Sequence, residues 1–162
     1  MGLETPWEMA PIFQELSAHA GRLMPLIEAA NAEAWIRSGG ASDTYLAQKQ
    51  SALEQARALA IEAKALSAAP ERLSLGLQVL IRLQSLDAMV GSIADAVRRY
   101  QTAREAQELL KVAAQGGNTR DRIQYYLVNL ATQREKDYEV MDREAQRCRG
   151  IVTQAPPRTK KN

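Results

Sequence analysis

The sequence predicts an all-α protein, an antiparallel up-down-up-down four-helix bundle with one extra short helix between helices three and four. Apolar residues recur at three- and four-residue intervals over residues 73–100, which is the spacing of one helix face. Ala and other helix-forming residues are abundant, and aromatic residues make up only 5% of the chain. Short joints containing Gly or Pro separate the periodic segments, so consecutive helices are expected to be antiparallel neighbours.

The segment 73–100 is the central helix of this prediction. Its apolar face consists of Leu75, Val79, Leu83, Leu86, Val90, Ile93, Val97 and Tyr100. The longest uncharged run, residues 73–81, is about half the ~20 apolar residues that a membrane span needs, which favours a buried helix. Arg82 lies at one edge of this face, where its long side chain reaches water. Asp87 lies at the other edge, and its short side chain reaches less far.

The first helix is expected to begin at Pro6, because Thr5, Pro6 and Glu8 form the pattern of a capping box. Its periodic apolar residues continue past Pro25, which should bend the helix by removing one backbone hydrogen bond. The element is predicted to end after Ile36, at the two glycines 39–40.

The second helix is expected to begin near Ser42 or Asp43 and to end near Ser67, shortly before Pro70. One helix over residues 71–115 would be about 67 Å long and would extend beyond its neighbours. The sequence therefore predicts a break near residues 100–102 and a short helix over residues 103–114. The last helix is predicted over residues 118–150.

Length and charge suggest one helical-bundle domain, residues 1–153, followed by a disordered basic tail, residues 154–162. The 21 basic and 19 acidic residues are interspersed and leave a net charge of +2, which argues against a dedicated nucleic-acid-binding protein. The N-terminus has no signal-peptide pattern. The chain is therefore expected to be cytoplasmic, or periplasmic or secreted if an upstream signal peptide was removed.

No catalytic, metal or cofactor motif is evident. A di-iron bundle needs two Glu-x-x-His motifs, whereas this chain has one histidine, His19. Gly-rich phosphate loops, zinc-ligand spacing and haem attachment motifs are absent from the sequence. Cys148 falls on the apolar face of the last helix, where an inert buried thiol is expected. An enzyme is accordingly the last of the functional hypotheses, and no cofactor is expected.

One ion pair is predicted inside the bundle. Asp87 lies near the middle of the third helix, and Arg134 lies near the middle of the last one. Antiparallel neighbours of similar length meet at their midpoints, so Asp87 and Arg134 are expected to form a partly buried pair that fixes the register of the two helices.

The leading functional hypothesis is a non-enzymatic module that acts through a protein partner or as a homodimer. The alternative is a small-molecule-binding, sensor-like bundle with a pocket between helices near His19, Pro25 and Trp35. A cavity of several hundred Å³ at these three residues would favour the alternative.

Overall fold

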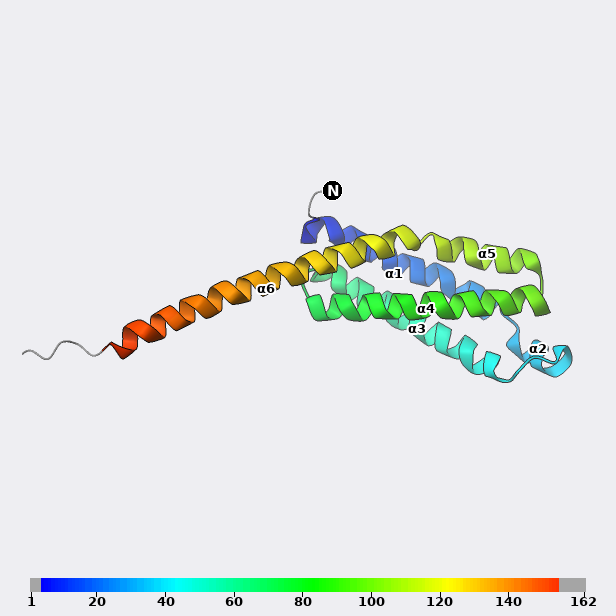
Figure 1. Cartoon of the computed structure of the whole chain (residues 1–162). Helices are drawn as coiled ribbons and strands as arrows, with labels where there is room; N and C mark the ends of the chain where they lie inside the picture. Colours follow the sequence, from blue (N-terminus) through cyan, green and yellow to red (C-terminus); the bar gives the residue numbers. More distant parts are fainter. Residues whose placement is uncertain (1–3, 155–162) are drawn as a thin grey trace, which may run out of the picture.

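The computed structural model describes residues 4–154 and confirms an all-α bundle without strands in that range (Figure 1). The helices are α1 (Pro6–Glu28), α2 (Ala32–Gly39), α3 (Thr44–Ala68), α4 (Leu73–Tyr100), α5 (Ala103–Ala114) and α6 (Gly117–Thr153). Three positions of the bundle are filled by α1, α3 and α4. The fourth position is shared by α5 and the beginning of α6, which follow one another along α4 (Figure 1).

The N-terminus of α1 forms as predicted. The Glu8 carboxylate accepts hydrogen bonds from the Thr5 backbone N–H at 2.8 Å and from the Thr5 hydroxyl at 2.6 Å. These hydrogen bonds lower the pKa of Glu8. Pro25 lies inside α1, and the helix continues past it to Glu28.

The first predicted element is in fact two helices. It was expected to continue to Ile36, but α1 ends at Glu28 and a separate helix, α2, begins at Ala32. Asn31 caps α2, because its side chain accepts a hydrogen bond from the Ala34 backbone N–H at 3.2 Å. A capping Asn satisfies a backbone donor that a continuous helix would have paired internally. Gly40 ends α2 with a φ of 70°, as the Gly-Gly joint predicted.

The core consists of one apolar cluster to which every helix contributes. The predicted face of α4 is buried in it, and Val79, Leu83 and Leu86 are fully inaccessible to solvent. By length and hydropathy, α4 is the one described helix that could cross a membrane. It is also the central helix of this core, and the core helix of a bundle meets the same criteria.

The predicted break after α4 is confirmed. The helix ends at Tyr100, and Thr102 caps α5 by accepting a hydrogen bond from the Glu105 backbone N–H at 3.2 Å. Gln101, between the two helices, accepts a hydrogen bond from the Asn31 backbone N–H at 2.8 Å. This hydrogen bond connects the segment between α4 and α5 to the segment between α1 and α2.

The last helix differs from its prediction in position and length. The buried residues of α6 are Ile123, Tyr126 and Leu127, all in its first third, and the helix then continues past the end of the bundle (Figure 1). It also continues through Gly150, where it was expected to end, to Thr153. The last helix is shifted along the bundle because α5 already covers one half of α4. Apart from Gln154, the predicted disordered tail lies outside the described residues.

Candidate interaction surface on helix α6

The main candidate surface is the part of α6 that leaves the bundle, residues 132–153, which we call the free half. Each of its residues is exposed, and no described residue buries any of them. A helix of this length extends for about 33 Å at 1.5 Å per residue. Such a long helix without tertiary packing is unusual, because packing of one face supplies most of the stability of helices in proteins.

Apolar and small residues line one face of the free half at heptad spacing. We call these residues the free stripe: Tyr138, Met141, Ala145, Cys148 and Val152. Their successive intervals of 3, 4, 3 and 4 residues are those of a coiled-coil seam. Tyr138 is 71% exposed, Met141 70% and Val152 84%. The free stripe is therefore an ordered apolar surface in contact with solvent.

The free stripe continues the face of α6 that packs into the bundle. Ile123 and Leu127 are buried on that face, and Leu130 packs against the core at its edge. Helical spacing leads from Leu130 through Arg134 to Tyr138. One face of α6 thus carries mainly apolar or small residues at helical spacing from Ile123 to Val152, and only its first part packs against described residues.

The beginning of α6 is anchored to the bundle by close contacts. The Tyr126 hydroxyl donates a hydrogen bond to the Pro70 carbonyl at 2.9 Å, and the Tyr126 ring meets the edge of Phe13 with centroids 6.1 Å apart. Gly76 of α4 allows Leu127 to approach closely, because a Cβ at Gly76 would collide with the Leu127 side chain. These contacts fix the direction in which the free half leaves the bundle.

The structure corrects the predicted partner of Asp87. The Asp87 carboxylate accepts a hydrogen bond from the Arg120 guanidinium at 3.1 Å, and Arg134 lies instead at the start of the free half. Because α5 displaces α6 along the bundle, the first turns of α6 face the middle of α4. Burial raises the pKa of Asp87, and the positive charge of Arg120 opposes that rise.

Arg82, the other charged residue at the edge of the apolar face of α4, forms an ion pair. Its guanidinium donates to both carboxylate oxygens of Glu62 on α3, each at 2.8 Å, and to the side-chain oxygen of Gln55 at 2.7 Å. The hydrogen bond to Glu62 raises the pKa of Arg82. A bidentate ion pair of this kind fixes the register of α3 against α4.

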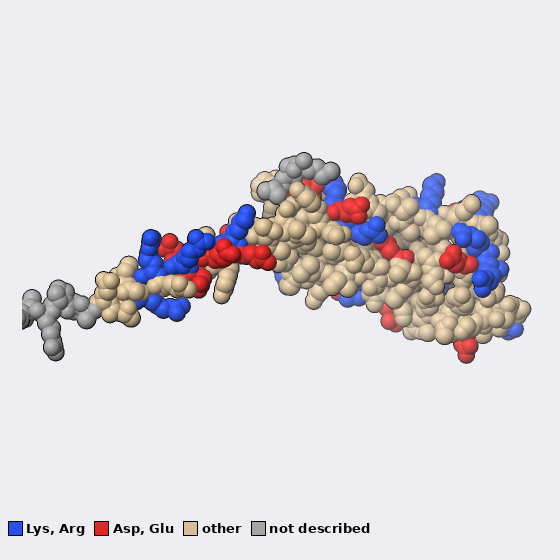
Figure 2. Space-filling model, viewed as in Figure 1, with Lys and Arg blue, Asp and Glu red and all other residues tan. Residues whose placement is uncertain are grey.

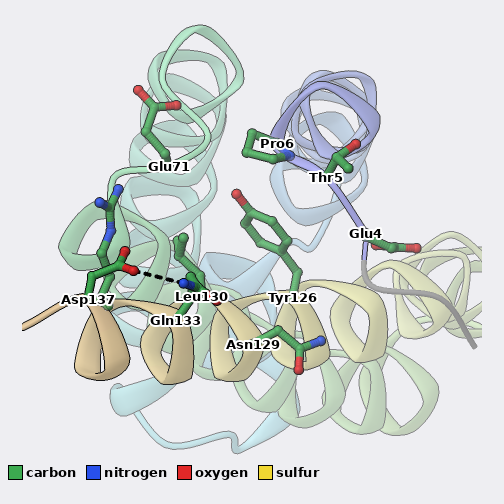
Figure 3. Close-up of a pocket in the computed structure, with 10 residues that line it drawn as sticks. Glu4, Thr5, Pro6, Glu71, Tyr126, Asn129, Leu130, Gln133 and Asp137 are labelled. Carbon is green, nitrogen blue, oxygen red and sulfur yellow. Dashed lines mark hydrogen bonds between the residues drawn. The ribbon is translucent and has the colours of Figure 1, made fainter. Parts of the chain in front are cut away.

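A cleft of about 360 Å³ lies where the free half leaves the bundle (Figure 3). Pro6 of α1, Tyr126 and Leu130 of α6, and Glu71 before α4 line it, together with Arg134. Figure 3 shows the Tyr126 ring between Pro6 and Leu130, and its hydroxyl donates to the Pro70 carbonyl, next to Glu71 in the chain. The cleft combines an apolar wall with three acidic side chains, Glu4, Glu71 and Asp137, and one basic side chain, Arg134.

The three residues predicted to line a pocket lie in different surroundings. His19 is buried, and a Cβ at Gly116, in the joint between α5 and α6, would lie 2.8 Å from its Nε2. Trp35 stacks on Tyr100 with ring centroids 5.9 Å apart, and Pro25 is exposed. None of the three lines the cleft at the base of the free half, and a shared pocket at these residues stays a prediction.

The environment of Cys148 differs from its prediction, and His19 has an unusual environment. Cys148 is exposed rather than buried, because its part of α6 has no neighbour in the bundle. Both ring nitrogens of His19 are buried and lack a hydrogen-bond partner among the described residues. Burial lowers the pKa of His19, and Arg22 lowers it further while Glu15 opposes them.

Comparison with known protein families, curated proteins and solved structures finds no match to this chain. Among the described residues, no group of three or more His, Cys, Asp or Glu side chains is placed to hold a metal ion. The geometry of α6 is the main structural indication of function.

The sequence contains a sign that the free half does not pack against the bundle, although the apolar periodicity alone does not show it. Residues 132–153 include ten charged residues among 22, with Arg134 on the packing face itself. Helices that are buried along one face usually keep that face free of charge. The charge at Arg134 therefore marks where packing against the bundle ends.

Proposed function

We propose that this chain is a non-enzymatic interaction module whose bundle holds and orients a helix for binding another protein. The observation that carries the proposal is the free stripe, an apolar face at coiled-coil spacing that the bundle leaves in contact with solvent. Exposed contiguous apolar surface of this kind is typical of protein interaction sites.

The mode of binding follows from the spacing of the stripe. Residues that recur every three and four positions along a helix fit against another helix, where each side chain enters a gap between neighbouring side chains. The anchored beginning of α6 sets the direction of the helix before binding. Less conformational entropy is then lost on association than if the helix formed only in the complex.

The test compares two substitutions to lysine that lie on different faces of the free half. Met141→Lys places a charge in the free stripe. Val140→Lys makes the same kind of change one residue away, at a side chain that is 56% exposed and points away from the stripe. Tagged wild-type chain and both variants are used to capture proteins from cells that produce the chain. Captured proteins are identified by mass spectrometry, and binding is repeated with purified components.

We expect the wild type and Val140→Lys to bind the same partner and Met141→Lys to bind it at least about tenfold more weakly. Circular dichroism should show equal helix content in all three, because both positions are exposed. Equal binding by both variants would contradict the proposal.

The cleft at the base of the free half supports a second candidate function, binding of a small molecule. Its volume of about 360 Å³ lies within the range of ligand sites. Tyr126 and Leu130 would contact the apolar part of a ligand, and the carboxylates of Glu71 and Asp137 would pair with a cationic group on it. Under this alternative, Asp137→Ala should abolish the thermal stabilisation that a cationic ligand gives the wild type.

A further inference from the structure

We infer that the partner of the free stripe is a second copy of this chain, bound with its free half antiparallel to the first. This inference rests on the proposed function and names the occupant of the same surface. Three features of the free half support it: the sizes of the residues in the stripe, the distribution of charge along the helix, and the position of the bundle at one end.

Side-chain size along the stripe fits antiparallel pairing. We place the two-fold axis of the pair level with Arg143 of each copy. Tyr138 then lies opposite Cys148 of the second copy, and Met141 lies opposite Ala145 of the second copy. Each layer then joins a large side chain to a small one, which is how tightly packed helices interdigitate. Val152 falls opposite the aliphatic stem of Arg134 of the second copy.

Parallel pairing would instead place identical residues in the same layer. Two Tyr138 rings would then meet in one layer, and two Ala145 methyl groups would leave another layer underfilled. Overfilled and underfilled layers both destabilise a helix interface. The order of large and small residues therefore favours the antiparallel arrangement.

The distribution of charge along the free half also favours antiparallel pairing. Residues 132–142 carry four acidic and two basic side chains, a net charge of −2, and residues 143–153 carry three basic and one acidic, a net charge of +2. Figure 2 shows the acidic groups gathered nearer the bundle and the basic groups farther out. Antiparallel pairing places each acidic half beside a basic half, whereas parallel pairing places like charges together.

The position of the bundle at one end of the free half favours the same arrangement. Antiparallel pairing keeps the two bundles at opposite ends of the paired helices, where they do not crowd each other. In this arrangement Glu135 lies beside Arg149 of the second copy, and symmetry forms this contact twice.

The interface is small, so association should depend strongly on concentration. The free half holds about three heptads, and interfaces of this size are weak unless reinforced. We expect sedimentation equilibrium of the full chain, over about 1–100 µM, to show a reversible monomer–dimer equilibrium. Met141→Lys should raise the dissociation constant at least about tenfold, because each dimer carries the change twice. Val140→Lys should leave it within about twofold.

Oxidative cross-linking tests the orientation with the native Cys148. In the antiparallel pair the two Cys148 residues are about 15 Å apart along the axis, beyond the separation that a disulfide spans. The unmodified chain should therefore form no covalent dimer under mild oxidation. Tyr138→Cys should form one rapidly, and peptide mapping should find the bond between position 138 of one copy and Cys148 of the other.

The possible results separate this inference from the proposed function. A chain that stays monomeric throughout, or a dimer that cross-links through two Cys148 residues, overturns the antiparallel self-association. If the chain is monomeric but a different protein binds through Met141, the proposed function stands and the second copy is the wrong partner. If Met141→Lys changes neither self-association nor capture, both proposals fail.

Discussion

At the scale of single residues, Gly76 controls how closely α6 approaches the central helix. The Leu127 side chain occupies the space that a Cβ at Gly76 would need, and Leu127 is itself buried. Gly91, on the same helix, has open space where its Cβ would be. These two glycines have the same intrinsic disadvantage in a helix, so a comparison of the two isolates the packing contact.

We predict that Gly76→Ala lowers the free energy of unfolding by about 1–3 kcal/mol, because the added methyl group overfills the contact with Leu127. Gly91→Ala should raise it by up to about 1 kcal/mol through improved helix propensity. Urea unfolding followed by circular dichroism measures both. A destabilising effect of similar size at Gly91 would show that close packing at Gly76 is not the reason.

His19 is the second residue whose surroundings have a measurable consequence. It lies under the joint between α5 and α6, with both ring nitrogens buried and unpaired among the described residues. Protonation would place a charge where nothing described can accept its hydrogen bonds. Burial accordingly lowers the pKa of His19 from its ordinary 6.5 in the folded chain.

We predict that the chain loses stability as the pH falls from 7 to 5, because the unfolded chain binds a proton at His19 near pH 6.5 while the folded chain resists it. The His19→Gln variant should show a flatter dependence, since its side chain stays neutral. Asp87, whose pKa is raised by burial, is present in both proteins and does not contribute to the difference. Identical pH profiles in urea titrations would contradict this account.

At the scale of helices, local signals predicted most boundaries, although they missed the break between α1 and α2 and placed the end of α6 too early. The break after Tyr100 followed from comparing the length of one continuous helix with the lengths of its neighbours. The Asp87–Arg134 pair required knowing how far α6 is displaced along α4, and that depends on whether α5 packs in the bundle. Apolar periodicity identifies the face of a helix that packs, but it does not identify the partner.

The free half gives an element-scale prediction. Ending the chain after Ala131 removes only residues that are exposed or outside the described range, so the free energy of unfolding should change by less than about 0.5 kcal/mol. Ending it after Arg122 also removes the buried Ile123, Tyr126 and Leu127 and should destabilise the bundle by several kcal/mol. Chemical unfolding of both truncations measures the effect. A large loss from the shorter deletion would show that the free half stabilises the bundle.

At the scale of the whole molecule, the sequence predicted the class and the number of bundle positions, because an amphipathic helix needs neighbours on its apolar side. It did not predict the unequal division of the last helix between core and solvent. Residues such as Tyr138 and Met141 have the same spacing as core residues, so the pattern is the same whether the neighbour lies in the same chain or in another one. Only the structure identifies the candidate surface, because in it the bundle ends before these residues.

The projection of α6 also determines how the molecule diffuses and scatters. A compact chain of 162 residues would have a radius of gyration of about 15 Å. A helix that extends about 33 Å beyond the bundle places mass far from the centre, so small-angle X-ray scattering of the Met141→Lys variant should give a clearly larger radius and an asymmetric distance distribution with a long tail. The same elongation increases translational friction, and the chain should elute from a sizing column ahead of compact proteins of its mass.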